Sequence, residues 1–138
     1  MNAAQELLKL KNDELAQHLM RFFKTGKGQY GEGDKFLGIR APKTREIAKK
    51  YYKTTPLTET QSMLDNPYHE IRLCALLMMV FIYEKTDRKE EIVNLYLKNT
   101  KNINNWDLVD NTAHKIIGAH YIKTKNPEKN FAIDESIR

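Results

Sequence analysis

The sequence predicts an all-α protein, an α-α superhelix made of stacked helix pairs. Apolar residues recur at helical spacing along nearly the whole chain, and no segment alternates between apolar and polar residues over the length of a strand. Glycine and proline interrupt this pattern at intervals that suit short, connected helices. With 138 residues, 41% of them hydrophobic, the chain is long enough for a single domain, residues 1–138, with its own core.

The first half of the chain predicts several helices separated by clear breaks. Leu7 to Phe23 has the apolar spacing of one helix or of a helix pair, which ends in the glycine-rich stretch Thr25 to Gly33. Gly38 to Pro42 is typical of a loop that places its proline in the first turn of a helix, where a missing N–H is harmless. That helix extends to about Tyr52, and a shorter one follows from Pro56 to about Leu64.

The second half predicts a long buried helix, its partner and a final helix. The long helix opens at Asn66-Pro67, its partner includes Ile92 to Leu97, and the final helix spans about Asn104 to Tyr121. The expected core stripe of the long helix is Ile71, Cys74, Ala75, Met78, Met79 and Ile82.

Two of these helices match each other when the sequence is shifted by 38 residues. The shift aligns Ile71 with Val109, Cys74 with Thr112, Ala75 with Ala113, Met78 with Ile116, Met79 with Ile117 and Tyr83 with Tyr121. This spacing suits a solenoid whose units bury their apolar faces on each other, although two amphipathic helices also match by chance. Phe131 to Arg138 begins another helix with no polar capping unit after it, so we expect the domain to be truncated at its C-terminal end.

Bulk composition excludes several classes of protein. The longest apolar run, Leu73 to Tyr83, is too short to cross a bilayer, and Met1 to Lys11 lacks the pattern of a secretory signal. Cys74 is the only cysteine, which excludes an internal disulfide and a thiolate metal cluster. We therefore expect a cytoplasmic protein without a membrane segment, a metal or a cofactor.

Positive charge is concentrated in one part of the chain. The formal net charge is +5, and the segment Arg21 to Lys53 holds ten lysine or arginine residues against Glu32, Asp34 and Glu46. Clustered cations favour a polyanionic partner, because phosphates that meet them release counterions. A solvated helix face is the alternative that charge alone leaves open.

The segment Asn105 to Asn111 contains the most informative cluster of side chains. On a helix, Trp106 and Asp110 are four residues apart and share one face, so an aromatic ring and a carboxylate are presented together. Such a pair suits a cationic ligand. Taken alone, the segment also fits a core tryptophan with Asp107 as an acid near a helix N-terminus.

Three stretches of the chain resemble the DNA alkylation repair family, which is built of HEAT-like helical repeats. These are Phe36-Leu37-Gly38-Ile39-Arg40-Ala41-Pro42 with Arg45, the helix start Tyr68-His69-Glu70-Ile71-Arg72, and Trp106-Asp107-Leu108-Val109-Asp110. The last is the most specific, and the likeness extends from about Phe22 to Tyr121.

The resemblance implies a DNA glycosylase that cleaves the N-glycosidic bond of N3- or N7-alkylated purines in double-stranded DNA. It implies that Asp110 is the catalytic carboxylate and that Trp106 and Tyr30 are aromatic residues of the site. A concave basic surface would hold the DNA through Lys35, Arg40, Lys43 and Arg45. The 38-residue shift places Arg72 at the position of Asp110, which adds it as a phosphate contact.

One expected element is missing, and other functions remain open. Family enzymes have a Trp-x-x-Arg segment beyond this region, whereas Trp106 is the only tryptophan here, so we expect weak or no activity from these 138 residues alone. The alternatives are a non-catalytic protein that binds DNA or senses damage, and a helical scaffold that binds an acidic protein. Asp110 and His114 lack further ligands for a metal.

Overall fold

The structure confirms the all-α fold. The computed structural model describes residues 1–22, 35–103 and 112–125, and none of these residues forms a strand. The α-helices are α1 (Ala3–Lys9), α2 (Asp13–Phe22), α3 (Ala41–Tyr51), α4 (Leu57–Leu64), α5 (His69–Lys85), α6 (Lys89–Lys98) and α8 (Ala119–Lys125). A 3₁₀ turn covers Thr100–Asn102, and a π-helical segment, His114–Gly118, leads into α8.

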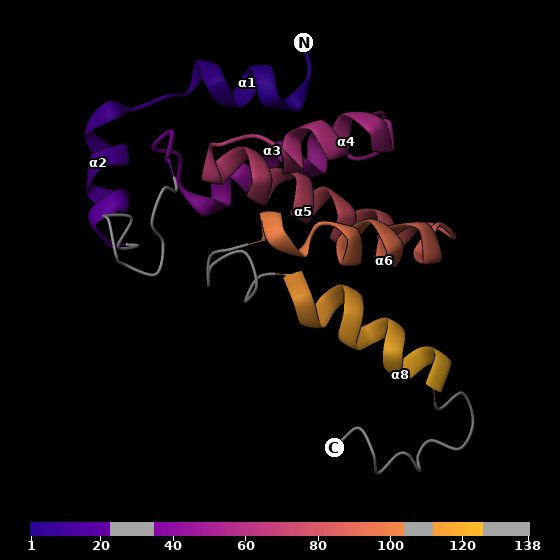
Figure 1. Cartoon of the computed structure of the whole chain (residues 1–138). Coiled ribbons are helices and arrows are strands. Elements are labelled where there is room, and N and C mark those ends of the chain that lie inside the picture. The colour runs from indigo at the N-terminus through magenta and orange to yellow at the C-terminus, as the bar shows by residue number, and fades with distance from the viewer. Residues whose placement is uncertain (23–34, 104–111, 126–138) are drawn as a thin grey trace.

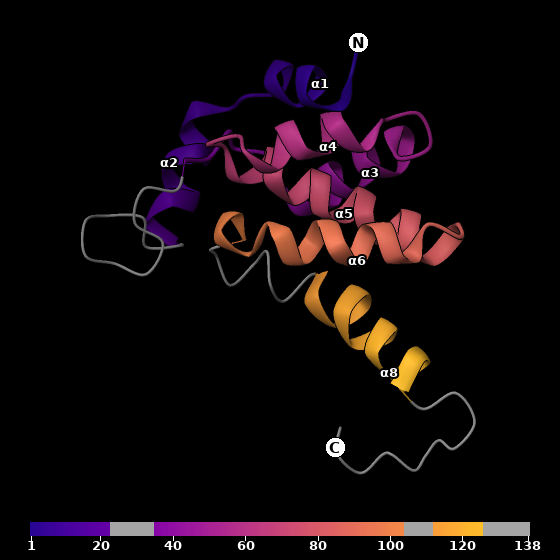
Figure 2. The ribbon, with the colours of Figure 1, turned by 45° about the vertical axis from the view of Figure 1, so that its right-hand side comes forward.

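The helices stack in layers that follow the order of the chain (Figure 1). α1 lies at one end, α3, α4 and α5 come next, and α6 and then α8 follow. The same order is kept when the molecule is turned (Figure 2). α5 is central, because it contacts α1, α3, α4, α6 and the π-helical segment. This arrangement is consistent with the HEAT-like superhelix expected from the sequence.

α5 forms the core of the stack. Every residue from His69 to Tyr83 is buried, including the whole predicted stripe from Ile71 to Ile82. The other faces of the helix are buried as well, because α3 and α4 cover one side and α6 covers another. A helix that is apolar all round is stable only when enclosed, and each large side chain buried here contributes roughly 1.5–3 kcal/mol.

One pair of residues 38 positions apart forms hydrogen bonds between neighbouring layers. Gln61 of α4 and Asn99, the residue that ends α6, are 38 positions apart and exchange two amide hydrogen bonds, 2.7 Å and 2.9 Å long. Cys74 and Thr112, a second such pair, are both fully buried, as are Met78 and Ile116. The aligned Tyr83 is buried whereas Tyr121 is 41% exposed, so the repeat of 38 residues stays a prediction.

The segment predicted to form one helix or a helix pair forms a pair, and Asn12 starts the second helix. The Asn12 side chain accepts a hydrogen bond from the N–H of Leu15 (3.0 Å), and its carbonyl accepts from Ala16 (2.9 Å). Asparagine satisfies N–H groups at a helix start in this way, so α2 begins anew. The glycine-rich stretch predicted to end this pair lies outside the described residues.

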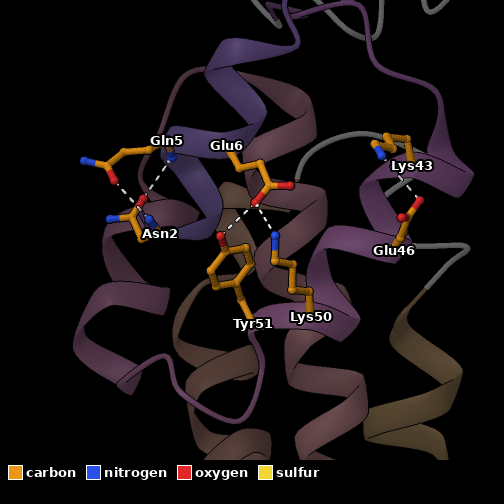
Figure 3. Close-up of polar contacts among 7 residues, drawn as sticks. All are labelled: Asn2, Gln5, Glu6, Lys43, Glu46, Lys50 and Tyr51. Carbon is orange, nitrogen blue, oxygen red and sulfur yellow. Dashed lines mark hydrogen bonds and ion pairs between the residues drawn. The ribbon is translucent and has the colours of Figure 1, made fainter.

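Polar contacts attach α1 to the end of α3 (Figure 3). Glu6 accepts hydrogen bonds from the Tyr51 hydroxyl (2.7 Å) and the Lys50 ammonium (3.0 Å). A reciprocal capping box between Asn2 and Gln5 fixes the start of α1. A helix of seven residues is marginal alone, so these contacts and the burial of Leu7 hold it in place.

The final helix differs from its predicted bounds at one end. The helical segment continues to Lys125, beyond the predicted end near Tyr121, and its predicted beginning near Asn104 lies outside the described residues. Within the part of the chain that the structure describes, no helix is both long and apolar enough to cross a membrane.

Candidate nucleic-acid interface

The loop before α3 is held tightly between α2 and α5. The Asn12 N–H donates to the Leu37 carbonyl (2.8 Å), and the His69 N–H donates to the Lys35 carbonyl (2.7 Å). Gly38 has a φ of 90°, and a Cβ there would lie 2.1 Å from the Asn12 carbonyl oxygen. Only glycine fits such a close approach in the left-handed region.

A buried carboxylate fixes the same loop from the side of α5. Glu70 is 1% exposed, and its oxygens accept hydrogen bonds from the backbone N–H groups of Leu37 (2.7 Å), Gly38 (3.0 Å) and Ile39 (3.2 Å). Charge-assisted bonds of this kind are stronger than neutral ones. Sequence analysis assigned no role to Glu70, because its partners lie 31 to 33 positions away in the chain. Its one signal is a carboxylate in the first turn of a mostly apolar helix.

Two hollows lie along α3 and α5 and share part of their lining. The first has a volume of about 410 Å³ and is lined by Leu19, Ile39, Arg40, Ala41, Pro42, His69, Glu70 and Leu73. The second, of about 250 Å³, is lined by Ala41, Pro42, Arg45, Leu73 and Leu77. They share Ala41, Pro42 and Leu73, so we call them together the α3–α5 groove. Arg40 lines the first hollow and Arg45 lines the second.

The groove is cationic where α3 begins. Arg40, Lys43 and Arg45 are exposed, although Lys43 forms an ion pair with Glu46 (3.5 Å) and Arg45 lies over the Phe81 ring at 5.0 Å. The first turn of α3 has no acidic residue, whereas α1, α2, α4, α5 and α6 each have at least one. Cations at a helix N-terminus oppose its dipole, and an anion bound there would relieve this.

The remaining predicted DNA contacts are not gathered in the α3–α5 groove. Lys35 is exposed but lines a separate hollow of about 390 Å³ beside Ala16 and Tyr68. Arg72 is only 6% exposed, and its Nη1 donates to the Asn66 carbonyl (2.9 Å) in the turn before α5. Its predicted phosphate contact is not tested by this placement and stays a prediction.

The predicted catalytic residues lie outside the described residues, and so does Tyr30. Thr112, two positions after Asp110, is the first described residue beyond them. Its hydroxyl lies 3.0 Å from the Tyr96 hydroxyl in the core, and this contact anchors the segment to α6. Burial raises the pKa of Tyr96, and the bond to Thr112 offsets part of this rise. Sequence reasoning missed this anchor, because nothing in the pattern pairs α6 with Thr112.

A second polar contact holds the following helix. His120 of α8 lies 3.0 Å from the Tyr83 hydroxyl through Nδ1, and its Nε2 is 3.6 Å from a carboxylate oxygen of Glu90. The described residues contain no group of three or more histidine, cysteine or acidic side chains that suits a metal ion.

Fold and surface together define an all-α helical stack with a cationic groove, an architecture suited to a polyanion. The chain belongs to the DNA alkylation repair enzyme family, whose model matches residues 3–135, nearly its whole length. This confirms the resemblance seen in the sequence and gives the protein a role in DNA repair. Comparisons with curated proteins and with solved structures gave no match.

Proposed function

We propose that this protein is a DNA glycosylase that excises N3- and N7-alkylated purines from double-stranded DNA in the cytoplasm. The observation that carries the proposal is the family match over residues 3–135, within which the segment Trp106 to Asp110 supplies a carboxylate and an aromatic ring. Asp110 is the catalytic carboxylate of the proposal, and Trp106 is the aromatic wall.

The chemistry needs few protein groups. A purine alkylated at N3 or N7 is cationic, so it leaves without strong general-acid assistance. The transition state gains positive charge on the sugar, and an anion beside it lowers the barrier. Asp110 provides that anion and orients the attacking water, while the Trp106 ring faces the cationic base.

The α3–α5 groove is the proposed contact for the DNA backbone. Arg40 lines one of its hollows and Arg45 the other, and both meet phosphates together with Lys43. The first turn of α3 adds no opposing carboxylate. Lys35, Arg72 and Tyr30 remain further proposed contacts. Arginine suits this role because its planar fork matches phosphate oxygens.

The experiment is release of 7-methylguanine from methylated duplex DNA under single-turnover conditions. In line with the sequence expectation, we expect weak release of the base by the wild-type chain, and loss of this release in Asp110→Asn, which should keep its affinity for DNA. Asp87→Asn, which changes an exposed carboxylate between α5 and α6, is the matched control and should behave as wild type. Equal release by wild type and Asp110→Asn would contradict the role of Asp110.

A non-catalytic DNA-binding protein is the second candidate. The observation that favours it is the exposed Arg40 and Arg45 along α3, which suit binding to DNA and supply no catalytic group. DNA binding that depends on Arg40 and Arg45, with no base released in any condition, would select this candidate over the glycosylase.

A further inference from the structure

The Glu70 carboxylate serves a segment of chain far from its own helix. Its two oxygens take N–H groups from three consecutive residues of the loop before α3, Leu37 to Ile39, and it is almost fully enclosed. A helix-start acid usually binds N–H groups of its own first turn. Here the hydrogen-bonding capacity of Glu70 is used to hold another element.

The held loop leads directly into the cationic end of the groove. Arg40 follows Ile39, adopts an extended conformation with ψ of 151°, and is the residue from which α3 starts. Its own side chain makes no capping hydrogen bond to α3. The direction in which Arg40 leaves the loop is therefore set by the residues that Glu70 binds, and both Arg40 and Glu70 line the same hollow of about 410 Å³.

We propose that Glu70 is a positioning residue for DNA binding, which places Arg40 against a phosphate by fixing the loop before it. The proposal rests on the proposed DNA-binding function. Gly38 assists from the opposite side, because its contact with Asn12 prevents the loop from moving toward α2. Glu70 itself touches no DNA in this account.

The charge of Glu70 and its positioning role predict opposite effects on DNA affinity. A carboxylate near a phosphate repels it, so removing the charge of Glu70 should strengthen DNA binding if charge were its only effect. A positioning role predicts the opposite sign, because Gln in place of Glu70 has one acceptor oxygen for three N–H groups and its amide nitrogen meets them as a donor.

The test is a double-mutant cycle with Glu70→Gln and Arg40→Ala, measuring affinity for duplex DNA across a range of salt concentrations. We expect each single variant to bind about fivefold more weakly and to lower the salt slope by about 0.9, as for the loss of one phosphate contact. We expect Glu70→Gln to change affinity by less than about twofold when Arg40 is already alanine.

Matched controls separate charge from position. Glu84→Gln removes an exposed carboxylate at the other end of α5, and Lys85→Ala removes an exposed cation beside it. Circular dichroism and hydrogen exchange of the Leu37, Gly38 and Ile39 amides report whether the fold is kept and whether only the loop is released. If Glu70→Gln does not fold, Glu70→Asp, which keeps the charge but shortens its reach, takes its place in the cycle.

Failure of the positioning role can be distinguished from failure of the proposed function. Additive effects of the two substitutions, or tighter binding by folded Glu70→Gln, would overturn the positioning role in a chain that still binds DNA. A wild-type chain with no affinity for DNA would overturn the proposed function itself and this proposal with it.

Discussion

At the scale of single residues, the clearest constraint is at Gly38. We expect Gly38→Ala to lower the free energy of unfolding by about 2–4 kcal/mol, because the added methyl group meets the Asn12 backbone in a left-handed conformation. Denaturant unfolding measures this, with the exposed Ser62→Ala as the control. A loss no larger than that of the control would show that the loop relaxes away from α2.

Cys74 provides a second test at this scale. Burial raises the pKa of its thiol from the ordinary 9.0 to about 12, so very little thiolate forms at mildly alkaline pH. We expect alkylation in the folded protein to be slower than in the unfolded chain by roughly two to three orders of magnitude. Comparable rates in both states would mean that the centre of α5 is open to solvent.

At the scale of elements, the attachment of α1 to α3 depends on pH. The hydrogen bond from Tyr51, and then that from Lys50, lower the pKa of Glu6 below 4.5. The contribution of Glu6 to stability is therefore complete above its unfolded pKa and is lost as the pH falls through the lower folded pKa.

We expect Glu6→Gln to reduce the fall in melting temperature between about pH 5 and pH 3, and Tyr51→Phe to reduce it more than Lys50→Ala. Thermal unfolding followed by circular dichroism provides the measurement. Glu59→Gln, on α4, is the control. Identical pH profiles for wild type and Glu6→Gln would exclude this contact as a source of stability.

At the scale of the whole molecule, neighbouring layers are joined by polar pairs as well as by the core. We expect Asn99→Ala to destabilise the fold by about 1–2 kcal/mol, since Asn99 is buried and binds Gln61 and the Leu95 carbonyl. Asn94→Ala, on the exposed side of α6, is the control for unfolding measurements. A Gln61→Ala background in which Asn99→Ala costs just as much would argue against coupling between the layers.

The sequence was a good guide to the fold, for physical reasons that α5 illustrates. Its apolar periodicity and its Asn66-Pro67 start predict both the helix and its buried stripe. The pattern did not show that the other faces of α5 are also covered, because that depends on neighbours supplied by distant segments. The exact break between α1 and α2 likewise depends on one Asn12 side chain.

The site was predicted less completely. Local charge and the family resemblance together indicated Arg40, Lys43 and Arg45, and all three are exposed at the start of α3. It did not separate Lys35 from them, nor anticipate that Arg72 is mostly buried, because sequence spacing does not report burial. Glu70 was overlooked as a positioning residue, since its three partners come from a loop that only the folded chain brings near.

The central claim is that Asp110 is the carboxylate that promotes excision of purines whose alkylation has already made them cationic. Its most direct test is to measure which bases wild type and Asp110→Asn release from duplexes that carry either 7-methylguanine or the neutral O6-methylguanine. The account predicts release of 7-methylguanine alone, and its loss in Asp110→Asn. Release of the neutral base, or undiminished release by Asp110→Asn, would contradict it.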